Sequence, residues 1–238
     1  TDTGVYRQTY VGGDYVFSIE KVGANCGLIG PQAARDVNGV VYWMSNAGFF
    51  VYNGSVQKLD CSLYDNIFNK NFGDGLNEQQ AFKVFCGVNA EFSEIWWFYP
   101  SRNSEENDRY IVYNFMDNLW YDGIRPRTTW EDASVFSRPI ATNTSTTAYY
   151  HEVGANADGA ELPFLLYTSF FDIDDGSEIM FVDQYVPDYK YVQGDFKIEF
   201  GFKKYPESSE ETYKGPFTIA GHHVLYMRGR GRKLEIRY

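Results

Sequence analysis

The sequence is poor in the residues that build metal centres and redox sites. Its 238 residues include only three cysteines and three histidines. Cys26, Cys61 and Cys86 are widely spaced, whereas zinc and redox sites favour closely spaced CxxC pairs. We therefore expect three reduced thiols, no metal and no cofactor, in a protein that is assembled in a reducing cytoplasm.

Long hydrophobic runs are also absent. No stretch approaches the roughly 20 apolar residues that a helix needs to cross a bilayer, so no membrane span is predicted. The chain begins with Thr1 rather than Met, and no basic segment followed by an apolar segment stands near it, which argues against a signal peptide. We expect the chain to be part of a longer protein.

Basic residues are outnumbered by acidic ones. The chain has 21 Lys and Arg against 32 Asp and Glu, which gives a net charge of −11 at pH 7. A protein that wraps nucleic acid is normally basic, so attraction of DNA over the whole surface is not expected, although a local basic patch is compatible with this charge. Charged residues make up 22% and aromatic residues 18%, which argues against disorder.

Catalytic signatures are missing as well. The sequence has no GxSxG, HExxH or Walker motif, and nothing in it selects a pair of carboxylates for glycoside hydrolysis. The adjacent His222 and His223 would point to opposite faces of a strand, so we expect these two and His151 to be surface or interface side chains.

The segment Asp172–Glu178 resembles a calcium loop, but its glycine comes one residue early and its flanks look like strands. A polar turn is the favoured interpretation and a bound ion the alternative, and we predict no catalytic residues.

Short apolar blocks separated by turn signals fill the rest of the sequence, and almost nothing repeats at helical spacing. This pattern is typical of antiparallel β structure. After the turn signal Asn38-Gly39, the first block predicts the strands Val40–Met44, Phe49–Tyr52 and Val56–Leu59. The connecting turns are so short that only neighbouring strands can pair, so the block is predicted to be a meander.

A second block predicts the strands Glu94–Tyr99, Tyr110–Phe115 and Leu119–Tyr121. The run Ile95–Tyr99 is apolar on both faces of the strand, so we expect its sheet to be covered on both sides.

One short helix is predicted between the two blocks. Ser62–Asp65 matches a capping box, and Leu63, Ile67 and Phe68 could share one face of the helix.

The two blocks are similar to each other. Their aromatic pairs, Tyr42-Trp43 and Trp96-Trp97, are about 54 residues apart, and a period near ~50 residues with four short strands is typical of kelch-type propeller blades. We therefore predict an all-β fold of propeller-like antiparallel meanders, a fragment of a larger propeller protein, with at most one or two short helices.

The composition shifts after Val135. Two polar loops, Asn143–Thr147 and Ala155–Gly159, precede a further series of strands. The predicted strands are Leu162–Phe170, Glu178–Val182, Lys190–Tyr191, Phe196–Phe202, Phe217–Ile219, Val224–Met227 and Leu234–Ile236. We therefore assign residues 1–155 to the blades and 156–238 to further strands of the same or an adjoining β domain.

Positive charge is concentrated near the end of the chain, in the segment Arg228–Lys233. Arg228, Arg230 and Arg232 are spaced by two, so on a strand all three project from the same face, and the intervening glycines permit close backbone approach. Three interpretations remain open. They are a salt-bridge ladder with the acidic surface of a neighbouring subunit, which we favour, a contact with DNA phosphates, and a solvated edge that blocks aggregation.

A set of short motifs follows in order from about residue 10 to the C-terminus. They are Gly30-Pro31, Val41–Ser45 with Gly48, Tyr52–Gly54, Glu94–Pro100, Asn107–Tyr110, Tyr113-Asn114 with Trp120, Asp174–Gly176, Pro187-Asp188, Tyr205-Pro206, Gly215–Phe217 and the alternating Arg-Gly segment. Together they resemble the β-propeller tail proteins of short-tailed bacteriophages. These are the tail nozzle or packaged-DNA stabilisation proteins, which extend the head-to-tail connector.

The resemblance implies a structural, non-enzymatic virion protein that is assembled in the host cytoplasm. It implies a ring, expected to be a homohexamer, that lies beneath the portal and adaptor, retains the packaged double-stranded DNA and conducts it during ejection. It supplies no catalytic residues. Under this hypothesis Arg228, Arg230 and Arg232 contact a neighbouring subunit or DNA, and charge reversal at all three is expected to disrupt ring assembly or genome retention.

An alternative from another class is a carbohydrate-binding or glycan-degrading β-propeller of a phage or bacterium. Exposed Tyr and Trp side chains would then serve as platforms for sugars. A third hypothesis, an intracellular kelch-like interaction module, would predict more regular repeats.

Overall fold

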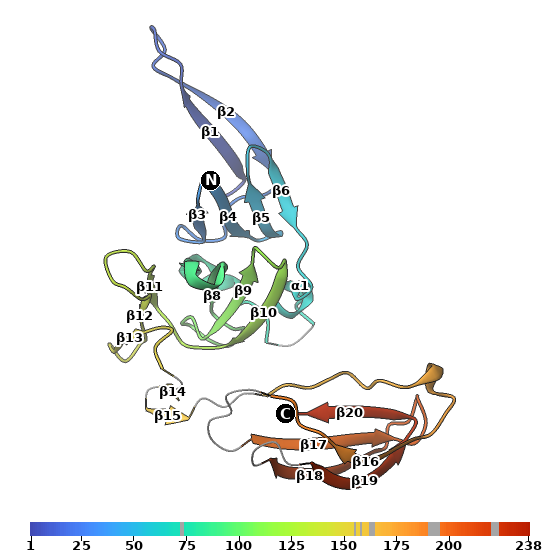
Figure 1. The fold of residues 1–238 in the computed structure, drawn as a ribbon. Helices are drawn as coiled ribbons and strands as arrows, with labels where there is room; N and C mark the ends of the chain where they lie inside the picture. The colour runs from blue at the N-terminus through green and yellow to red at the C-terminus, as the bar shows by residue number, and fades with distance from the viewer. Residues whose placement is uncertain (72–73, 155, 158, 162–164, 190–195, 220–223) are drawn as a thin grey trace. The chain divides into compact units, whose positions relative to one another are not determined.

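The computed structural model describes residues 1–71, 74–154, 156–157, 159–161, 165–189, 196–219 and 224–238. The chain divides into two compact units, Thr1–Gly154 and Ala155–Tyr238, one residue from the boundary that the composition indicates. Within each unit nearly all regular structure is antiparallel β-sheet, as predicted (Figure 1). No helix of the described ranges has the length and apolar character that a membrane span requires.

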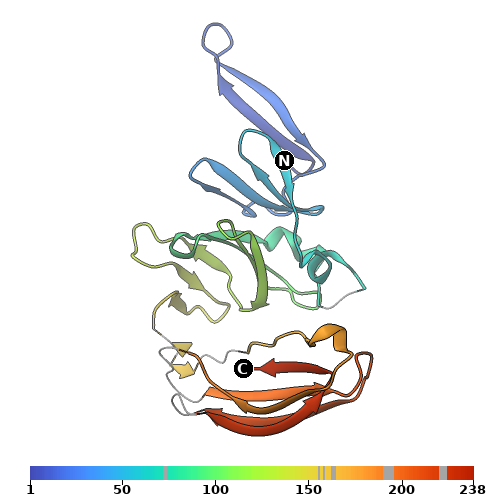
Figure 2. The ribbon, with the colours of Figure 1, turned by 45° about the vertical axis from the view of Figure 1, so that its right-hand side comes forward.

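Unit 1 (Thr1–Gly154) begins with a long β-hairpin that the sequence analysis did not identify. Its strands β1 (Gly4–Tyr10) and β2 (Phe17–Ala24) pair with each other and with no other strand of the described chain. The hairpin extends away from the rest of unit 1 in both ribbon views (Figures 1 and 2). Its base is anchored, because Val5 packs against a small buried cluster that contains Trp43 and Phe50.

Two four-stranded meanders follow. The first consists of β3 (Ala34–Val37), β4 (Val40–Ser45), β5 (Gly48–Tyr52) and β6 (Val56–Leu59). The second consists of β7 (Phe85–Asn89), β8 (Glu94–Tyr99), β9 (Arg109–Asn114) and β10 (Leu119–Ile124). The three strands predicted in each block are confirmed, and β3 and β7 are additional. The closure of such sheets into a propeller stays a prediction.

The second meander is covered on both faces, which confirms the expectation for the run Ile95–Tyr99. Every residue of β8 is buried. On one face Ile95 and Trp97 join a core that includes Phe49 of β5. On the other face Trp96 packs with Trp130. Trp130 belongs to a third sheet, which is formed by β11 (Thr129–Glu131), β12 (Ile140–Thr142) and β13 (Ala148–Tyr150).

A short α-helix, α1 (Tyr64–Phe68), lies between the meanders, as predicted. Ile67 is buried in the main core of unit 1, and Leu63 and Phe68 pack against it, so the predicted face is confirmed. The capping box is wrong. Leu63 occupies the N-cap and no side chain caps the helix, because the helix begins later than the Ser62 motif requires. Short 3-10 helices cover Glu78–Lys83, Ala90–Phe92 and Asp174–Gly176.

Unit 2 (Ala155–Tyr238) has its own core between small antiparallel sheets. β16 (Met180–Tyr185) pairs with β19 (Leu225–Gly231), and β17 (Phe196–Lys203) lies between β18 (Glu211–Ile219) and β20 (Lys233–Arg237). The short strands β14 (Asn156–Ala157) and β15 (Ala160–Glu161) form a separate pair. Buried side chains from both larger sheets form one cluster: Met180, Ile198, Phe200, Phe202, Ile219, Met227 and Leu234.

One predicted strand of unit 2, Leu162–Phe170, is wrong over the residues that the structure describes. Over residues 165–170 the segment expected at Leu162–Phe170 forms only an isolated bridge, between Tyr167 and Arg237. The ladder is interrupted because the Ile236 N–H donates to the hydroxyl of Thr168, at 2.8 Å, instead of to a backbone carbonyl. The predicted strand Lys190–Tyr191 lies outside the described residues.

Candidate functional site

The arginine-rich segment falls mostly on β19. Arg228 and Arg230 are exposed, and the residues that alternate with them, Met227, Gly229 and Gly231, are buried. The two arginines therefore share the outer face of the strand, as the spacing of two predicts.

The glycines of this segment are required by close packing beneath the strand. A Cβ atom at Gly229 would lie 2.1 Å from Cζ of Phe202, and one at Gly231 would lie 2.7 Å from the carbonyl oxygen of Lys203. Any larger residue would have to push the ring of Phe202 or the backbone of β17 away. The expected close backbone approach is therefore present.

Arg232 differs from the prediction. β19 ends at Gly231, and Arg232 lies in the turn to β20 rather than on the arginine face. Its guanidinium donates to the carbonyl oxygens of Gly176 and Ser177, at 3.2 and 2.9 Å, and lies over the ring of Tyr205. The spacing rule fails here because the strand ends, and Arg232 holds two segments of unit 2 together.

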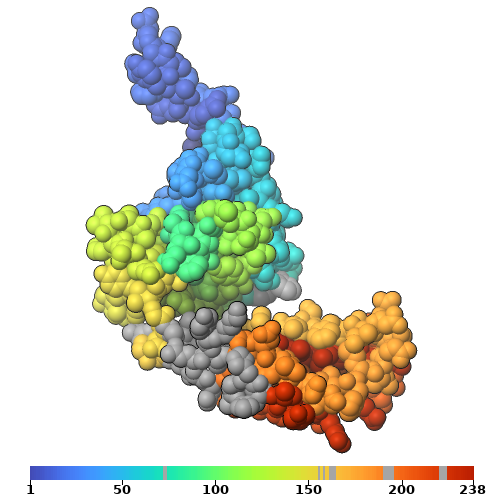
Figure 3. Space-filling view, in the orientation of Figure 1, coloured from blue at the N-terminus to red at the C-terminus, as the bar shows by residue number. Residues whose placement is uncertain are grey.

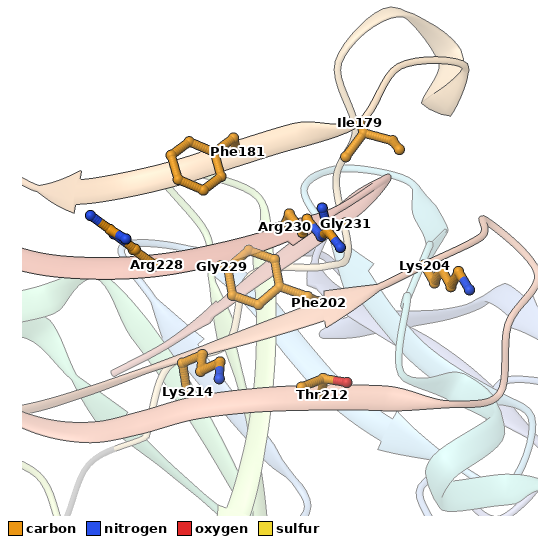
Figure 4. A pocket seen from close by; sticks show the side chains of 10 residues that line it. All are labelled: Ile179, Phe181, Phe202, Lys204, Thr212, Lys214, Arg228, Gly229, Arg230 and Gly231. Atoms are coloured by element: carbon orange, nitrogen blue, oxygen red, sulfur yellow. The ribbon is translucent and has the colours of Figure 1, made fainter.

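Arg228 and Arg230 line an open groove of about 770 Å³ (Figure 4). We call the cations on its walls the groove cations: Lys204, Lys214, Arg228 and Arg230. Phe202 and Phe181 supply aromatic surface, and Phe181 lies directly opposite Arg230 in the pairing of β16 with β19. Directly opposed residues share a face of the sheet, so this ring, which is 62% exposed, and the guanidinium border the same opening.

None of the groove cations forms an ion pair with a carboxylate in the part of the chain that the structure describes. Neighbouring cations of the same unit do have such partners. Lys203 pairs with Glu211 at 3.2 Å, and Arg237 pairs with Glu235 at 2.7 Å. The groove thus combines uncompensated positive charge with apolar surface, which suits an anionic ligand such as a carboxylate-bearing protein surface or a phosphate backbone.

The segment that resembles a calcium loop forms a turn. Asp174–Gly176 is a 3-10 turn, and Asp172 is paired with Lys233 at 3.5 Å. Over the described residues, no group of three His, Cys, Asp or Glu side chains is arranged to hold a metal ion.

His151 is buried within unit 1, so the expectation of a surface or interface histidine is wrong. Its Nε2 accepts a hydrogen bond from Nε of Arg127 at 3.0 Å, and its ring packs on Trp130 at 4.7 Å between centroids. Burial, reinforced by the charge of Arg127, lowers the pKa of His151 to about 4. His222 and His223 lie outside the described residues.

A buried carboxylate, Glu94, organises a second polar cluster in unit 1. It accepts hydrogen bonds from Nε1 of Trp96, at 2.9 Å, and from the hydroxyl of Tyr121. Burial and the bond to Glu94 raise the pKa of Tyr121, and burial with the nearby charge of Glu94 raises the pKa of Glu152. The bond from Tyr121 ties β10 to β8, and Glu152 accepts a separate hydrogen bond from Nδ2 of Asn89, at 3.2 Å, which ties the end of unit 1 to β7. This is a structural arrangement.

The tryptophans do not provide the sugar platforms of the alternative hypothesis. Trp43, Trp96, Trp97 and Trp130 are buried. Trp120 is half-buried, and its Nε1 donates to the carbonyl oxygen of Asp60. Exposed aromatic surface is left to Tyr and Phe side chains.

The three cysteines, Cys26, Cys61 and Cys86, are free thiols and all are buried. Burial raises the pKa of Cys61 to about 11 and that of Cys86 well above its usual value.

Sequence analysis missed the other walls of the groove. Lys204 follows the end of β17, Lys214 lies within β18, and Phe181 comes from β16. Only the pairing of strands far apart in the chain brings them beside Arg228 and Arg230, and no local pattern signals that pairing.

In comparisons with known proteins, no family model matches the chain, and no curated protein matches it in sequence.

Proposed function

We propose that the chain is a structural, non-enzymatic component of a short bacteriophage tail, of the nozzle or DNA-stabilisation type. In this role it forms a ring with other copies beneath the portal and adaptor, retains packaged double-stranded DNA and lets it pass during ejection. The protein is assembled in the host cytoplasm and ends in the virion. The observation that carries the proposal is the ordered set of motifs from Gly30-Pro31 to the arginine-rich segment.

The groove of unit 2 supplies a contact for such a ring. Its cations have no carboxylate partner within the described chain, while the chain as a whole carries a net charge of −11. A neighbouring copy therefore presents an acidic surface to this groove, and opposite charges both accelerate and orient such an encounter. We assign Arg228 and Arg230 to the contact with a neighbouring subunit, and we leave Arg232 out because it is bound within its own chain.

The buried aromatic layers of unit 1 suit a protein that must withstand pressure. Rings pack on both faces of β8, with Trp97 and Phe49 4.9 Å apart on one side and Trp96 and Trp130 5.8 Å apart on the other. Densely packed aromatic interiors resist compression, as a channel around pressurised DNA requires.

The location in the virion is tested with gold-labelled antibodies against the chain on short-tailed phage particles, viewed by electron microscopy. We expect gold at the distal part of the tail. Gold on peripheral fibres would move the function to carbohydrate recognition, and particles without gold would refute a virion role.

The contact is tested by charge reversal in the double variant Arg228→Glu with Arg230→Glu. We expect rings or oligomers of the wild type to dissociate, with the association constant lowered roughly tenfold or more. A matched control reverses two exposed lysines that do not line the groove, Lys70→Glu with Lys197→Glu, and should assemble normally. Unchanged assembly of the arginine variant would contradict the assignment. If the variant assembles normally but no longer binds DNA, the groove is a contact with the phosphate backbone of DNA.

A further inference from the structure

The β1–β2 hairpin exposes most of its apolar surface to solvent. It stands out from unit 1 as a narrow arm in the space-filling view (Figure 3). Tyr6, Tyr10, Phe17 and Ile19 are 48%, 70%, 53% and 70% exposed. An isolated two-stranded hairpin is at best marginally stable in water, so this arm is suited to a partner that covers it.

The arm has one aromatic face and one polar face. The strand register places Tyr10 opposite Phe17 and Gln8 opposite Ile19, and the rings of Tyr10 and Phe17 are 5.8 Å apart. On the other face, Arg7 lies opposite Glu20, and the two side chains form an ion pair at 2.7 Å.

Both edges of the arm are open. The N–H of Val11 donates to the carbonyl oxygen of Val16, at 3.1 Å, so that pair is hydrogen-bonded, and hydrogen-bonded pairs alternate along an antiparallel ladder. Gln8 and Ile19 consequently direct their N–H and C=O groups outward. No third strand meets these groups in the described chain. Proteins normally block such edges with proline or bulges, but neither strand contains proline, and the single register shift lies at the base, between Val5 and Tyr6.

We propose that the outer edge of β2 pairs with the outer edge of β1 of a second copy of this chain. The charges select this partner. On the polar face β1 carries Arg7 and no acid, and β2 carries Glu20 and no base, because Lys21 of β2 lies opposite Tyr6 on the aromatic face. Joining β2 to the next β1 therefore continues the alternation of Glu20 and Arg7 across copies. Joining two β1 edges would bring basic strands together without an acid.

This contact is head-to-tail, so each added copy leaves one β1 edge and one β2 edge open. Such contacts repeat until a ring closes or a filament grows. When all arms point the same way, β2 of one copy runs antiparallel to β1 of the next, and the aromatic faces become continuous. The inference does not rest on the virion role, although it gives a ring of this chain a second contact besides the groove.

Cross-linking of cysteine variants tests the pairing. Gln8→Cys places a thiol on the β1 edge and Ile19→Cys places one on the β2 edge, whereas the native cysteines are buried. We expect a short bismaleimide to give covalent dimers when the two variants are mixed, and few dimers with either variant alone. A matched control, Ser145→Cys in an exposed loop, should give few dimers in any mixture.

Two outcomes would overturn the proposal: no dimers in the mixture, or as many dimers from Gln8→Cys alone as from the mixture, which would indicate pairing of like edges. If the mixture forms dimers but gold labelling finds no copy of the chain on phage particles, the virion role is overturned and the hairpin pairing stands.

Proline at position 8 gives a second measurement. Gln8→Pro removes an outward N–H without removing a hydrogen bond inside the hairpin, so association in sedimentation velocity should weaken roughly tenfold. Gln8→Thr keeps the N–H and should associate like the wild type. Equal association of the proline and threonine variants, with unchanged circular dichroism, would refute edge pairing.

Discussion

The buried pair of Arg127 and His151 predicts an acid-sensitive unit 1. An arginine side chain can only donate hydrogen bonds, so Nε2 of His151 must accept the bond at 3.0 Å, and the neutral ring carries its proton on Nδ1. Protonation of Nε2 would set two donors against each other and place a second positive charge beside Arg127. This is the physical reason for the lowered pKa of the histidine.

The direction and size of the change in stability with pH follow from the linkage between proton binding and folding. The pKa of His151 is about 4 in the folded state against 6.5 for an unperturbed histidine, so the unfolded chain binds the proton more tightly. Stability is therefore complete above pH 6.5 and is lost as the pH falls toward 4. The loss reaches about 3 kcal/mol at pH 4 and is already about 1 kcal/mol at pH 5.5.

Urea denaturation at pH 7.0 and 5.5, followed by far-ultraviolet circular dichroism, measures this loss. The lower pH stays above the isoelectric point of about 4.7, where the chain would precipitate. The control is His151→Gln, which keeps an acceptor for Arg127 and cannot be protonated. The wild type should lose about 1 kcal/mol more than this variant between the two pH values. Equal losses in both proteins would refute the assignment of a neutral, buried histidine.

Two further predictions concern the packing of unit 1. Gly87→Ala should destabilise unit 1 by about 2 kcal/mol in urea denaturation, because the new Cβ would lie 2.3 Å from Cδ1 of Trp130. The cost should shrink in a Trp130→Leu background, and a cost that is the same in both backgrounds would contradict the clash. The native thiols should react with a chromogenic disulfide at pH 8 at least ~100-fold more slowly than in urea, because burial raises the pKa of Cys61 and Cys86. Rapid reaction of the folded protein would contradict their burial.

Local signals predicted much of unit 1. The turns around Asn46–Gly48 and Asn53-Gly54 set the pairing of β4, β5 and β6, because a short turn leaves an antiparallel strand no other neighbour. β3 was missed since its four residues, Ala34–Val37, mix charge with small side chains and gain their place only by pairing with β4. The Gly12-Gly13 turn signal in the loop after Tyr10 was present, but it was not used to predict the hairpin.

The candidate site was less accessible to sequence analysis. The spacing of two placed Arg228 and Arg230 correctly because both lie within one strand. It failed for Arg232, since the position where β19 ends depends on backbone contacts with Lys203 and on carbonyl groups of a distant turn. The burial of His151 is likewise a tertiary effect, because Trp130 and Arg127 reach it from another strand and a loop.

The distribution of indole rings has a spectroscopic consequence. All five tryptophans precede residue 131, so unit 2 contains none. Each indole N–H is hydrogen-bonded: Trp43 to Cys26, Trp96 to Glu94, Trp97 to Ala33, Trp120 to Asp60 and Trp130 to Asp132. Emission excited selectively through indole therefore reports on the folding of unit 1 alone, while unit 2 contributes only to signals from tyrosine and the backbone. The two units can be followed separately in the unmodified chain, without an added fluorophore.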